Sequence, residues 1–362
     1  MRNLITLHRL KHDMEDIALK QETGRIDRFF QVSQNHSSVR TEVLAGITTF
    51  ITIAYILILN PQILADPYVI MGDAAMAGKI ANGVFIGTCI GAFIGTILCA
   101  LYARVPFAQA PGMGLNAFFT FTLVMGKGVS WQEALGVVFL SGTFFFILAV
   151  LGFREKLANA IPAPITTAST AGIGLFIAFI GLKNMGIIVG NEATLVALGK
   201  FNLPVVLSVL GLMMMAGFEM KKVRGGILIS IVITTILGII FGLVAMPNAV
   251  IATPPSIAPI AFKLNIFGAL RVSLLGSIFS FMFIDLFDSL GFLIACFKEI
   301  GLEDESGHYK GLGKMMFADV SSTIVGALLG TSTVTTFGES AAGIAAGAKT
   351  GLASFVTGML FL

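Results

Sequence analysis

The chain has 362 residues, of which 56% are hydrophobic and only 12% are charged. A soluble globular domain carries about 25% charged residues, and several apolar runs here reach the roughly 20 residues that cross a bilayer as a helix. The composition excludes a soluble enzyme and predicts an all-α integral membrane protein. The formal net charge of +3 is too small to indicate nucleic-acid binding, so no nucleic-acid partner is expected.

Residues 1–41 are polar and mix acidic with basic side chains. They lack the long apolar core and the small-residue cleavage site of a signal peptide. We interpret them as a solvated cytoplasmic tail. A surface amphipathic helix over residues 4–20 is the alternative.

Ten apolar segments follow the tail, and an eleventh begins near Gly351. They lie at about 43–60, 84–102, 108–125, 135–152, 165–182, 204–218, 226–245, 272–297, 314–329 and 331–347. If the tail and every second loop share one side of the membrane, that side receives 17 of the 23 Lys and Arg residues and the other side receives 6. The positive-inside rule then predicts a multi-pass protein of the cell (plasma) membrane with its N-terminus in the cytoplasm.

Two of these segments differ from ordinary spanning helices. In residues 108–120, one proline and two glycines interrupt the backbone just before Asn116. In residues 330–343, the five Ser and Thr hydroxyls of residues 331–336, Thr333 among them, and the flanking glycines weaken the helix. Interrupted segments in corresponding places of two halves are typical of a transporter binding site.

We single out three carboxylates that lie within apolar segments. Glu339 follows the hydroxyl-rich stretch, and Asp285 and Asp288 are three residues apart, hence on one helix face. An aspartate at a helix centre costs roughly 2.5–3.5 kcal/mol on insertion scales, so we expect these side chains to face a site. The alternatives are that Glu339 reaches the membrane interface, or that the aspartates pair with backbone groups or with Arg271.

The sequence contains no G-x-x-x-x-G-K-[ST], H-E-x-x-H or G-x-S-x-G motif, and the three cysteines have no spacing typical of a metal site. We therefore predict no enzyme, no metal and no cofactor.

At these residues the sequence resembles the nucleobase:cation symporter-2 superfamily, and within it the AzgA-like adenine/guanine/hypoxanthine permeases. The motifs that carry the resemblance lie, in order, at residues 39–46, 110–117, 285–288 and 330–336. The resemblance implies a fold of two inverted seven-helix repeats with core and gate domains, and a short strand plus a half-helix in the third and tenth segments. Residues 42–245 would form the first repeat and residues 246–362 an incomplete second repeat, with the last helices missing from this chain.

The resemblance also implies roles for individual residues. Glu339, Asp285 and Asn116 match the family's substrate-binding positions, and Asp288 and Gly114 match positions that support the site. We add Thr333, from the hydroxyl-rich stretch, as a substrate contact. Asp285 and Glu339 are the candidates for proton coupling, because nearby carboxylates that repel each other can hold and release a proton.

We therefore predict a secondary active transporter that imports purine nucleobases (adenine, guanine or hypoxanthine) by proton symport, with Na⁺ as the alternative coupling ion. Membrane lipids and a second copy of the chain are the other predicted partners. A uracil, xanthine or other solute carrier on the same fold, and a non-transporting truncated membrane protein, are the alternatives. One departure from the family is Gly338, which stands where a β-branched residue usually precedes the glutamate.

Overall fold

The computed structural model describes residues 24–151, 163–191, 194–223, 225–244, 253–302, 309 and 311–362. Most of the predicted tail, the predicted boundary between the repeats at residue 245 and the acidic loop at 303–308 lie outside the described residues.

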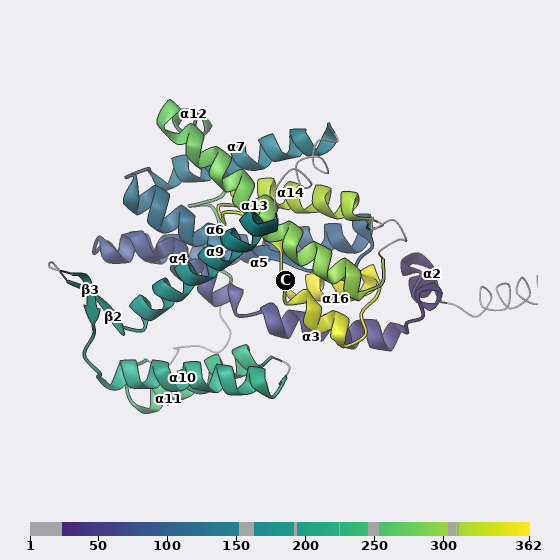
Figure 1. Ribbon diagram of the computed structural model, residues 1–362, viewed down its shortest axis with the longest axis horizontal. Helices are drawn as coiled ribbons and strands as arrows, with labels where there is room; N and C mark the ends of the chain where they lie inside the picture. Colours follow the sequence, from purple (N-terminus) through teal and green to yellow (C-terminus); the bar gives the residue numbers. More distant parts are fainter. Residues whose placement is uncertain are drawn as a thin grey trace, which may run out of the picture.

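The described part is mainly helical, with two small sheets (Figure 1). The elements up to residue 150 are α2 (Arg25–Phe30), the 3₁₀ turn η1 (Ser33–Asn35), α3 (Val39–Ile53), α4 (Ile56–Ile70), α5 (Ala74–Leu98), the π-helix η2 (Cys99–Ala103), β1 (Gln109–Pro111), α6 (Met113–Ala117), the π-helix η3 (Phe118–Gly126) and α7 (Trp131–Val150). The later elements are α9 (Ala163–Asn184), β2 (Ile188–Asn191), β3 (Leu195–Leu198), α10 (Leu203–Met220), α11 (Gly226–Ile240), α12 (Ile266–Ala269), α13 (Val272–Glu299), α14 (Leu312–Leu329), β4 (Val334–Thr336), α15 (Ser340–Ala345) and α16 (Gly351–Leu360).

Side-chain caps explain where several of these helices begin. The Ser38 and Asp73 side chains accept from the backbone N–H groups that open α3 and α5. At α7, Ser130 and Glu133 form a reciprocal capping box. Each cap satisfies a helix N–H group that has no partner within the helix, so the polar residues between apolar runs fix the helix starts.

Six helical segments of the described part are long and apolar enough to cross a membrane. They are Val39–Ile70, Ala74–Ala103, Trp131–Val150, Leu203–Met220, Val272–Glu299 and Leu312–Leu329. The first is longer than the predicted 43–60, because α4 continues through Pro61 and Pro67. Membrane helices tolerate such prolines where neighbouring groups satisfy the freed carbonyls.

The short strands predicted for the third and tenth segments are present as β1 and β4. The second sheet, the β2–β3 hairpin between α9 and α10, was not predicted. Figure 1 shows α10 and α11 as a pair below the other helices, next to this hairpin. The main buried core lies elsewhere and joins η3, α7 and α13 through Phe119, Trp131 and Phe281.

Glycines allow α3, α16 and η2 to approach closely. A Cβ atom at Gly46 of α3 would overlap the carbonyl oxygen of Ala353, and one at Gly351 would overlap that of Ala100. Small residues at such contacts are typical of helix packing in membranes, where close van der Waals contact replaces the hydrophobic effect.

We expect Gly46→Ala to lower the stability of the purified protein by about 1–3 kcal/mol, because the methyl group must push α16 away from α3. Gly78→Ala is the matched control, since nothing lies within 4 Å of a Cβ atom at that helical position. Thermal unfolding in detergent checks both variants. Equal unfolding midpoints for the two would contradict the described packing.

Candidate functional site

The two interrupted segments meet in an antiparallel pair of three-residue strands, β1 and β4. Gln109 lies opposite Thr336, and the pairing extends beyond the strands because Phe337 N donates to the carbonyl of Ala108 at 3.0 Å. All three residues of each strand are buried. Irregular backbone at membrane depth is stable only when other protein groups satisfy it, and each strand does this for the other.

A short helix follows each strand. β1 leads through Gly112 into α6 and η3, and β4 leads through Glu339 into α15. Gly112 N donates to the carbonyl of Thr333 at 3.3 Å, and a Cβ atom at Gly112 would lie 2.9 Å from the Thr335 side chain. The place where β1 and β4 pair, called the strand crossing or simply the crossing below, therefore needs glycine at position 112. The predicted strand and half-helix are confirmed in both segments.

The buried carboxylate of Asp319, on α14, holds the crossing from one side. Its Oδ1 accepts from the backbone N–H of Thr336 at 2.8 Å and from the Thr336 hydroxyl at 2.7 Å. Gln109 Nε2 of β1 donates to the same oxygen at 3.2 Å, and the Ser289 hydroxyl of α13 donates to Oδ2 at 2.6 Å. One side chain thus connects α14 with both strands and with α13.

Asp285 lies beside this network on α13 and is 2% exposed. Its Oδ2 accepts from the Thr323 hydroxyl at 3.1 Å, and that hydroxyl also lies 3.0 Å from the carbonyl oxygen of Val334 in β4. Asp288 is half-buried one turn further along α13. The alternative in which the aspartates pair with Arg271 is wrong, because Arg271 forms an ion pair with Glu133 at 2.6 Å.

Asn116 lies in α6, where its amide donates to Asn60 Oδ1 of α4. The Asn60 amide nitrogen in turn donates to the hydroxyls of Thr88 and Thr331 at 2.7 Å each. These buried bonds fix the Asn116 side chain through α4, α5 and the chain that leads into β4.

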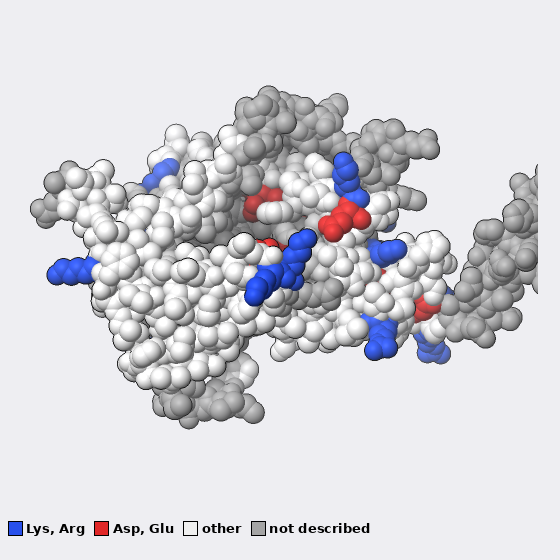
Figure 2. All heavy atoms as spheres, turned by 60° about the horizontal axis from the view of Figure 1, so that its bottom comes forward, with Lys and Arg blue, Asp and Glu red and all other residues white. Residues whose placement is uncertain are grey.

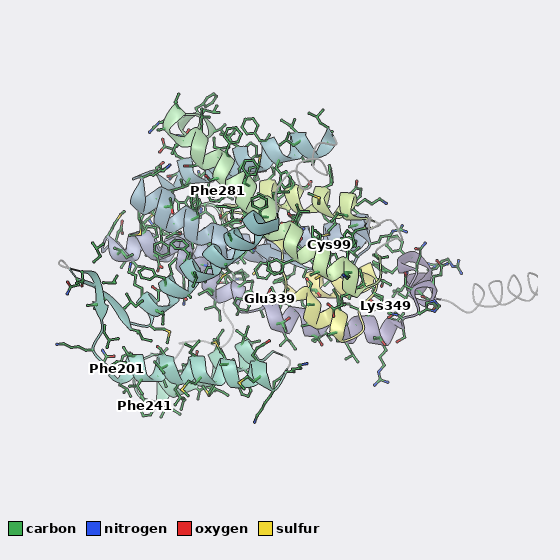
Figure 3. The ribbon with its side chains drawn as sticks, in the orientation of Figure 1. Cys99, Phe201, Phe241, Phe281, Glu339 and Lys349 are labelled. Atoms are coloured by element: carbon green, nitrogen blue, oxygen red, sulfur yellow. The ribbon has the colours of Figure 1, made fainter. Side chains whose placement is uncertain are left out.

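Glu339 accepts a hydrogen bond from the Tyr55 hydroxyl at 2.6 Å. Tyr55 lies at the junction of α3 and α4, and both side chains are half-buried. Figure 3 places Glu339 near the middle of the helical body. The alternative in which Glu339 extends to the membrane interface is therefore not observed.

Five buried polar atoms on or near the paired strands have no hydrogen-bond partner among the described residues: Gln109 Oε1, Asn116 Oδ1, Asp285 Oδ1, Ser332 Oγ and Thr333 Oγ1. Buried polar atoms are normally paired, so a group of unpaired ones marks the place where a polar ligand can bind. Figure 2 shows acidic atoms inside a hollow on one face of the molecule.

Four of the six predicted site residues, Asn116, Gly114, Thr333 and Glu339, belong to the two interrupted segments, and the other two, Asp285 and Asp288, lie on α13. Gly114 lies half-buried in α6, two residues before Asn116, and Thr333 immediately precedes β4. The contribution of each residue to binding stays a prediction.

Sequence reasoning missed three polar residues that position this site: Asp319, Asn60 and Tyr55. Asp319 is an acidic residue inside an apolar segment, which is the signal that identified Asp285, and it could have been found in the same way. Asn60 and Tyr55 carried no comparable signal, because their partners Thr331 and Glu339 lie more than 200 residues away in the sequence.

Gly338, the departure from the family pattern, has a structural explanation. A Cβ atom at this position would lie 2.6 Å from the ring of Phe292 on α13. Phe292 therefore occupies the space that a β-branched side chain would need. The close contact between Gly338 and Phe292 thus joins the chain just before Glu339 to α13, the helix that carries Asp285 and Asp288.

We expect Asp319→Asn to destabilise the protein by about 1–3 kcal/mol for each donor that it leaves unpaired, because an amide offers one acceptor oxygen instead of two. Ser321→Ala on the same helix is the control, since the Ser321 hydroxyl bonds the carbonyl of Phe317 within α14. Thermal unfolding in detergent measures both. Wild-type stability of Asp319→Asn would disprove its role at the crossing.

We expect Gly338→Ala to be destabilising by about 1–3 kcal/mol through overpacking against Phe292. Phe292→Ala should remove this penalty, so the double variant should be no less stable than Phe292→Ala alone. A double-mutant cycle of unfolding midpoints measures the coupling. Additive effects would show that the two residues do not compete for space.

Comparison with known proteins places this chain in a family. The chain matches the Permease family over residues 40–362. Adenine permease AdeQ of Escherichia coli (strain K12) is 41% identical over 345 residues, which cover 95% of this chain and 75% of that protein. Guanine/hypoxanthine permease PbuG of Bacillus subtilis (strain 168) is 44% identical over 338 residues, which cover 92% of this chain and 76% of that protein.

The fold is similar to the transmembrane domain of a cyanobacterium bicarbonate transporter, BicA, with a TM-score of 0.60 over 89% of this chain and 81% of that structure. At 18% sequence identity this similarity concerns the fold alone, and it confirms the predicted inverted-repeat transporter architecture. The chain is thus a multi-pass membrane transporter rather than an enzyme, and it belongs to the Permease family.

Proposed function

We propose that the protein imports purine nucleobases, such as adenine, guanine and hypoxanthine, across the cell membrane. The observation that carries the proposal is the set of buried oxygen atoms that have no hydrogen-bond partner among the described residues and lie on the segments around the β1–β4 pair. The names of the two permeases above support a purine substrate.

The chemistry of a purine base suits these groups. A purine is planar and carries N–H donors together with ring-nitrogen acceptors. Glu339 would accept from purine N–H groups, a charge-assisted bond that is strong in a dry site. Asn116 Oδ1 would accept another N–H group, and the Thr333 hydroxyl would donate to a ring nitrogen. Asp288, half-buried on α13, would contact another edge of the base.

We further propose that protons drive import through Asp285 and Glu339. The two carboxylates bond hydroxyl groups of Thr323 and Tyr55, and such donors tolerate both protonation states of an acid better than a fixed cation does. Sodium coupling is the alternative. It predicts uptake that depends on external Na⁺ and resists a protonophore.

The proposed transport movement carries the strand crossing past a gate. We assign the gate to α10 and α11, because these two helices pack against each other and α11 contacts α3 of the remaining helices. Residues 42–245 and 246–362 would contribute the two repeats. A cytoplasmic N-terminus and a homodimer belong to the same proposal, the former supported by the distribution of Lys and Arg.

Uptake of radiolabelled adenine, guanine, hypoxanthine and uracil by purine-uptake-deficient cells tests the function. Cells would express either the 362-residue chain or the whole reading frame that encodes it. We expect purine-selective uptake that a protonophore abolishes. Uracil-selective uptake, or none from either form despite membrane insertion, would overturn the proposed substrate.

In the active form, Glu339→Gln should lower uptake at low substrate concentration at least about tenfold, since a hydrogen bond to a charged group contributes about 1.5–3 kcal/mol. Asp285→Asn should lower uptake by a similar factor, and the remaining uptake should no longer respond to a protonophore. Glu219→Gln, an exposed glutamate at the end of α10, is the matched control. Wild-type uptake by both site variants would contradict the site assignment.

A further inference from the structure

Four polar side chains, called the Asn60 network below, form a connected set of hydrogen bonds that ends at the candidate site. They are Asn116 of α6, Asn60 of α4, Thr88 of α5 and Thr331, which lies three residues before β4. All four are fully buried, and the hydroxyl oxygens of Thr88 and Thr331 are 3.0 Å apart. Because buried polar groups are costly to leave unpaired, the bonds of this network determine which way each amide faces.

The direction of these bonds is set at α5. The Thr88 hydroxyl donates to the carbonyl of Val84 at 2.7 Å. A hydroxyl has one hydrogen, so the Thr88 oxygen can only accept from the Asn60 side chain, which lies 2.7 Å away. The end of Asn60 that faces Thr88 is therefore the amide nitrogen, and its second hydrogen bonds the Thr331 oxygen at 2.7 Å.

The same reasoning fixes the amide of Asn116. With its nitrogen on the two threonines, Asn60 turns Oδ1 toward Asn116, and a carbonyl oxygen can only accept. Asn116 therefore donates its amide nitrogen to Asn60 and keeps Oδ1 for the site, where that atom has no hydrogen-bond partner among the described residues. The two ends of an amide have nearly the same shape, so its neighbours decide which end a ligand meets.

The other unpaired oxygen atoms near the crossing are less selective or lie elsewhere. The hydroxyls of Ser332 and Thr333 can rotate to donate or to accept, so they suit either kind of ligand group. Gln109 Oε1 lies against α5, because a Cβ atom at Gly95 would be 2.7 Å from it. Asn116 Oδ1 is thus an atom of the site whose neighbours fix it as an acceptor.

Adenine and hypoxanthine differ at one edge of the purine ring in a way that such an acceptor can detect. Adenine has an acceptor at ring nitrogen N1 and an N–H donor on the amino group at C6. Hypoxanthine has the reverse pattern, an N–H donor at N1 and an acceptor oxygen at C6. A fixed oxygen bonds the base that places its N–H group opposite it, whereas an amide free to turn would bond either base.

We propose that Thr88 and Asn60 act through Asn116 to determine which purine the protein accepts. The Asn60 network holds Asn116 as an acceptor at the N1–C6 edge of the bound base, so the protein discriminates between adenine and hypoxanthine. Thr88 and Asn60 are positioning residues, since their own polar groups bond protein atoms. The inference rests on the proposed purine transport and adds the residues that choose between the two bases.

Thr88→Val should release the choice, because valine keeps the shape of threonine and removes its hydroxyl. The Thr331 hydroxyl can then donate to Asn60 Oδ1, Asn60 can donate to Asn116 Oδ1, and the Asn116 nitrogen can face the base. Both directions of the network leave the amides paired, so the variant should bond either base. Thr88→Ser keeps a hydroxyl that can donate to Val84 and should keep the wild-type direction.

Uptake of radiolabelled adenine and hypoxanthine over a range of concentrations tests this inference, in the form of the protein that is active in the assay above. The measured quantity is the ratio of Vmax/KM for the two bases, which does not depend on the amount of protein in the membrane. We expect the wild type and Thr88→Ser to prefer one base at least about fivefold, and Thr88→Val to reduce this preference at least about threefold, since one neutral hydrogen bond changes affinity about two- to tenfold.

Thr143→Val on α7 is the matched control. The Thr143 hydroxyl donates to the carbonyl of Phe139 at 2.8 Å, four residues earlier, as the Thr88 hydroxyl does to that of Val84. This control should keep the wild-type ratio. Thr88→Ala, which also lacks the hydroxyl and adds no bulk, takes the place of Thr88→Val if that variant does not reach the membrane.

The outcomes separate the inference from the proposed function. A wild-type preference that persists in Thr88→Val would overturn the inference and leave purine transport intact. Equal uptake of the two bases by the wild type would do the same. A lower Vmax for both bases with an unchanged ratio would show that Thr88 supports only the fold. Uptake of neither base by the wild type would overturn the proposed function together with the inference.

Discussion

The hydrogen bonds accepted by the Asp319 carboxylate hold together the elements that carry the candidate site. β1 and β4 have three residues each, too few for a stable sheet without further support. Asp319 supplies that support by accepting from Thr336 and Gln109, one residue on each strand. The positions of Asn116, at the first half-helix, and of Glu339, at the second, follow from how these strands cross.

Hydroxyl and amide groups, rather than cations, surround the buried acids of this crossing. Asp319 bonds Ser289 and Thr336, Asp285 bonds Thr323, and Glu339 bonds Tyr55. Such a site presents carboxyl groups with no balancing cation among the described residues, which disfavours inorganic anions and suits a neutral ligand rich in N–H groups. The similarity to a bicarbonate transporter concerns the fold alone, and the chemistry of this candidate site depends on its own side chains.

Hydropathy and charge predicted the class of protein and most spans, because membrane-length apolar runs leave few structural choices. The interruptions at 108–120 and 330–343 identified the two segments that pair as β1 and β4. Two features depend on contacts between residues that are not neighbours in the sequence, so no local sequence pattern predicts them. The partners of Asn60 and Tyr55 are distant in sequence, and Gly338 departs from the family because Phe292 fills the adjacent space. The strand and half-helix in each interrupted segment were predicted from the resemblance to the family and not from hydrophobic periodicity.

The strand crossing also constrains the order in which the protein is assembled. Gln109 and Thr336 are 227 residues apart, so β1 emerges from the ribosome long before its partner strand exists. Until then, the polar groups of residues 109–116 have no β4 to bond and are costly to leave in the hydrocarbon region. The first interrupted segment must therefore stay in contact with water or with protein, such as the insertion machinery. It reaches its final position only after β4 has been synthesised. Biogenesis, as much as transport, limits which side chains this segment can carry.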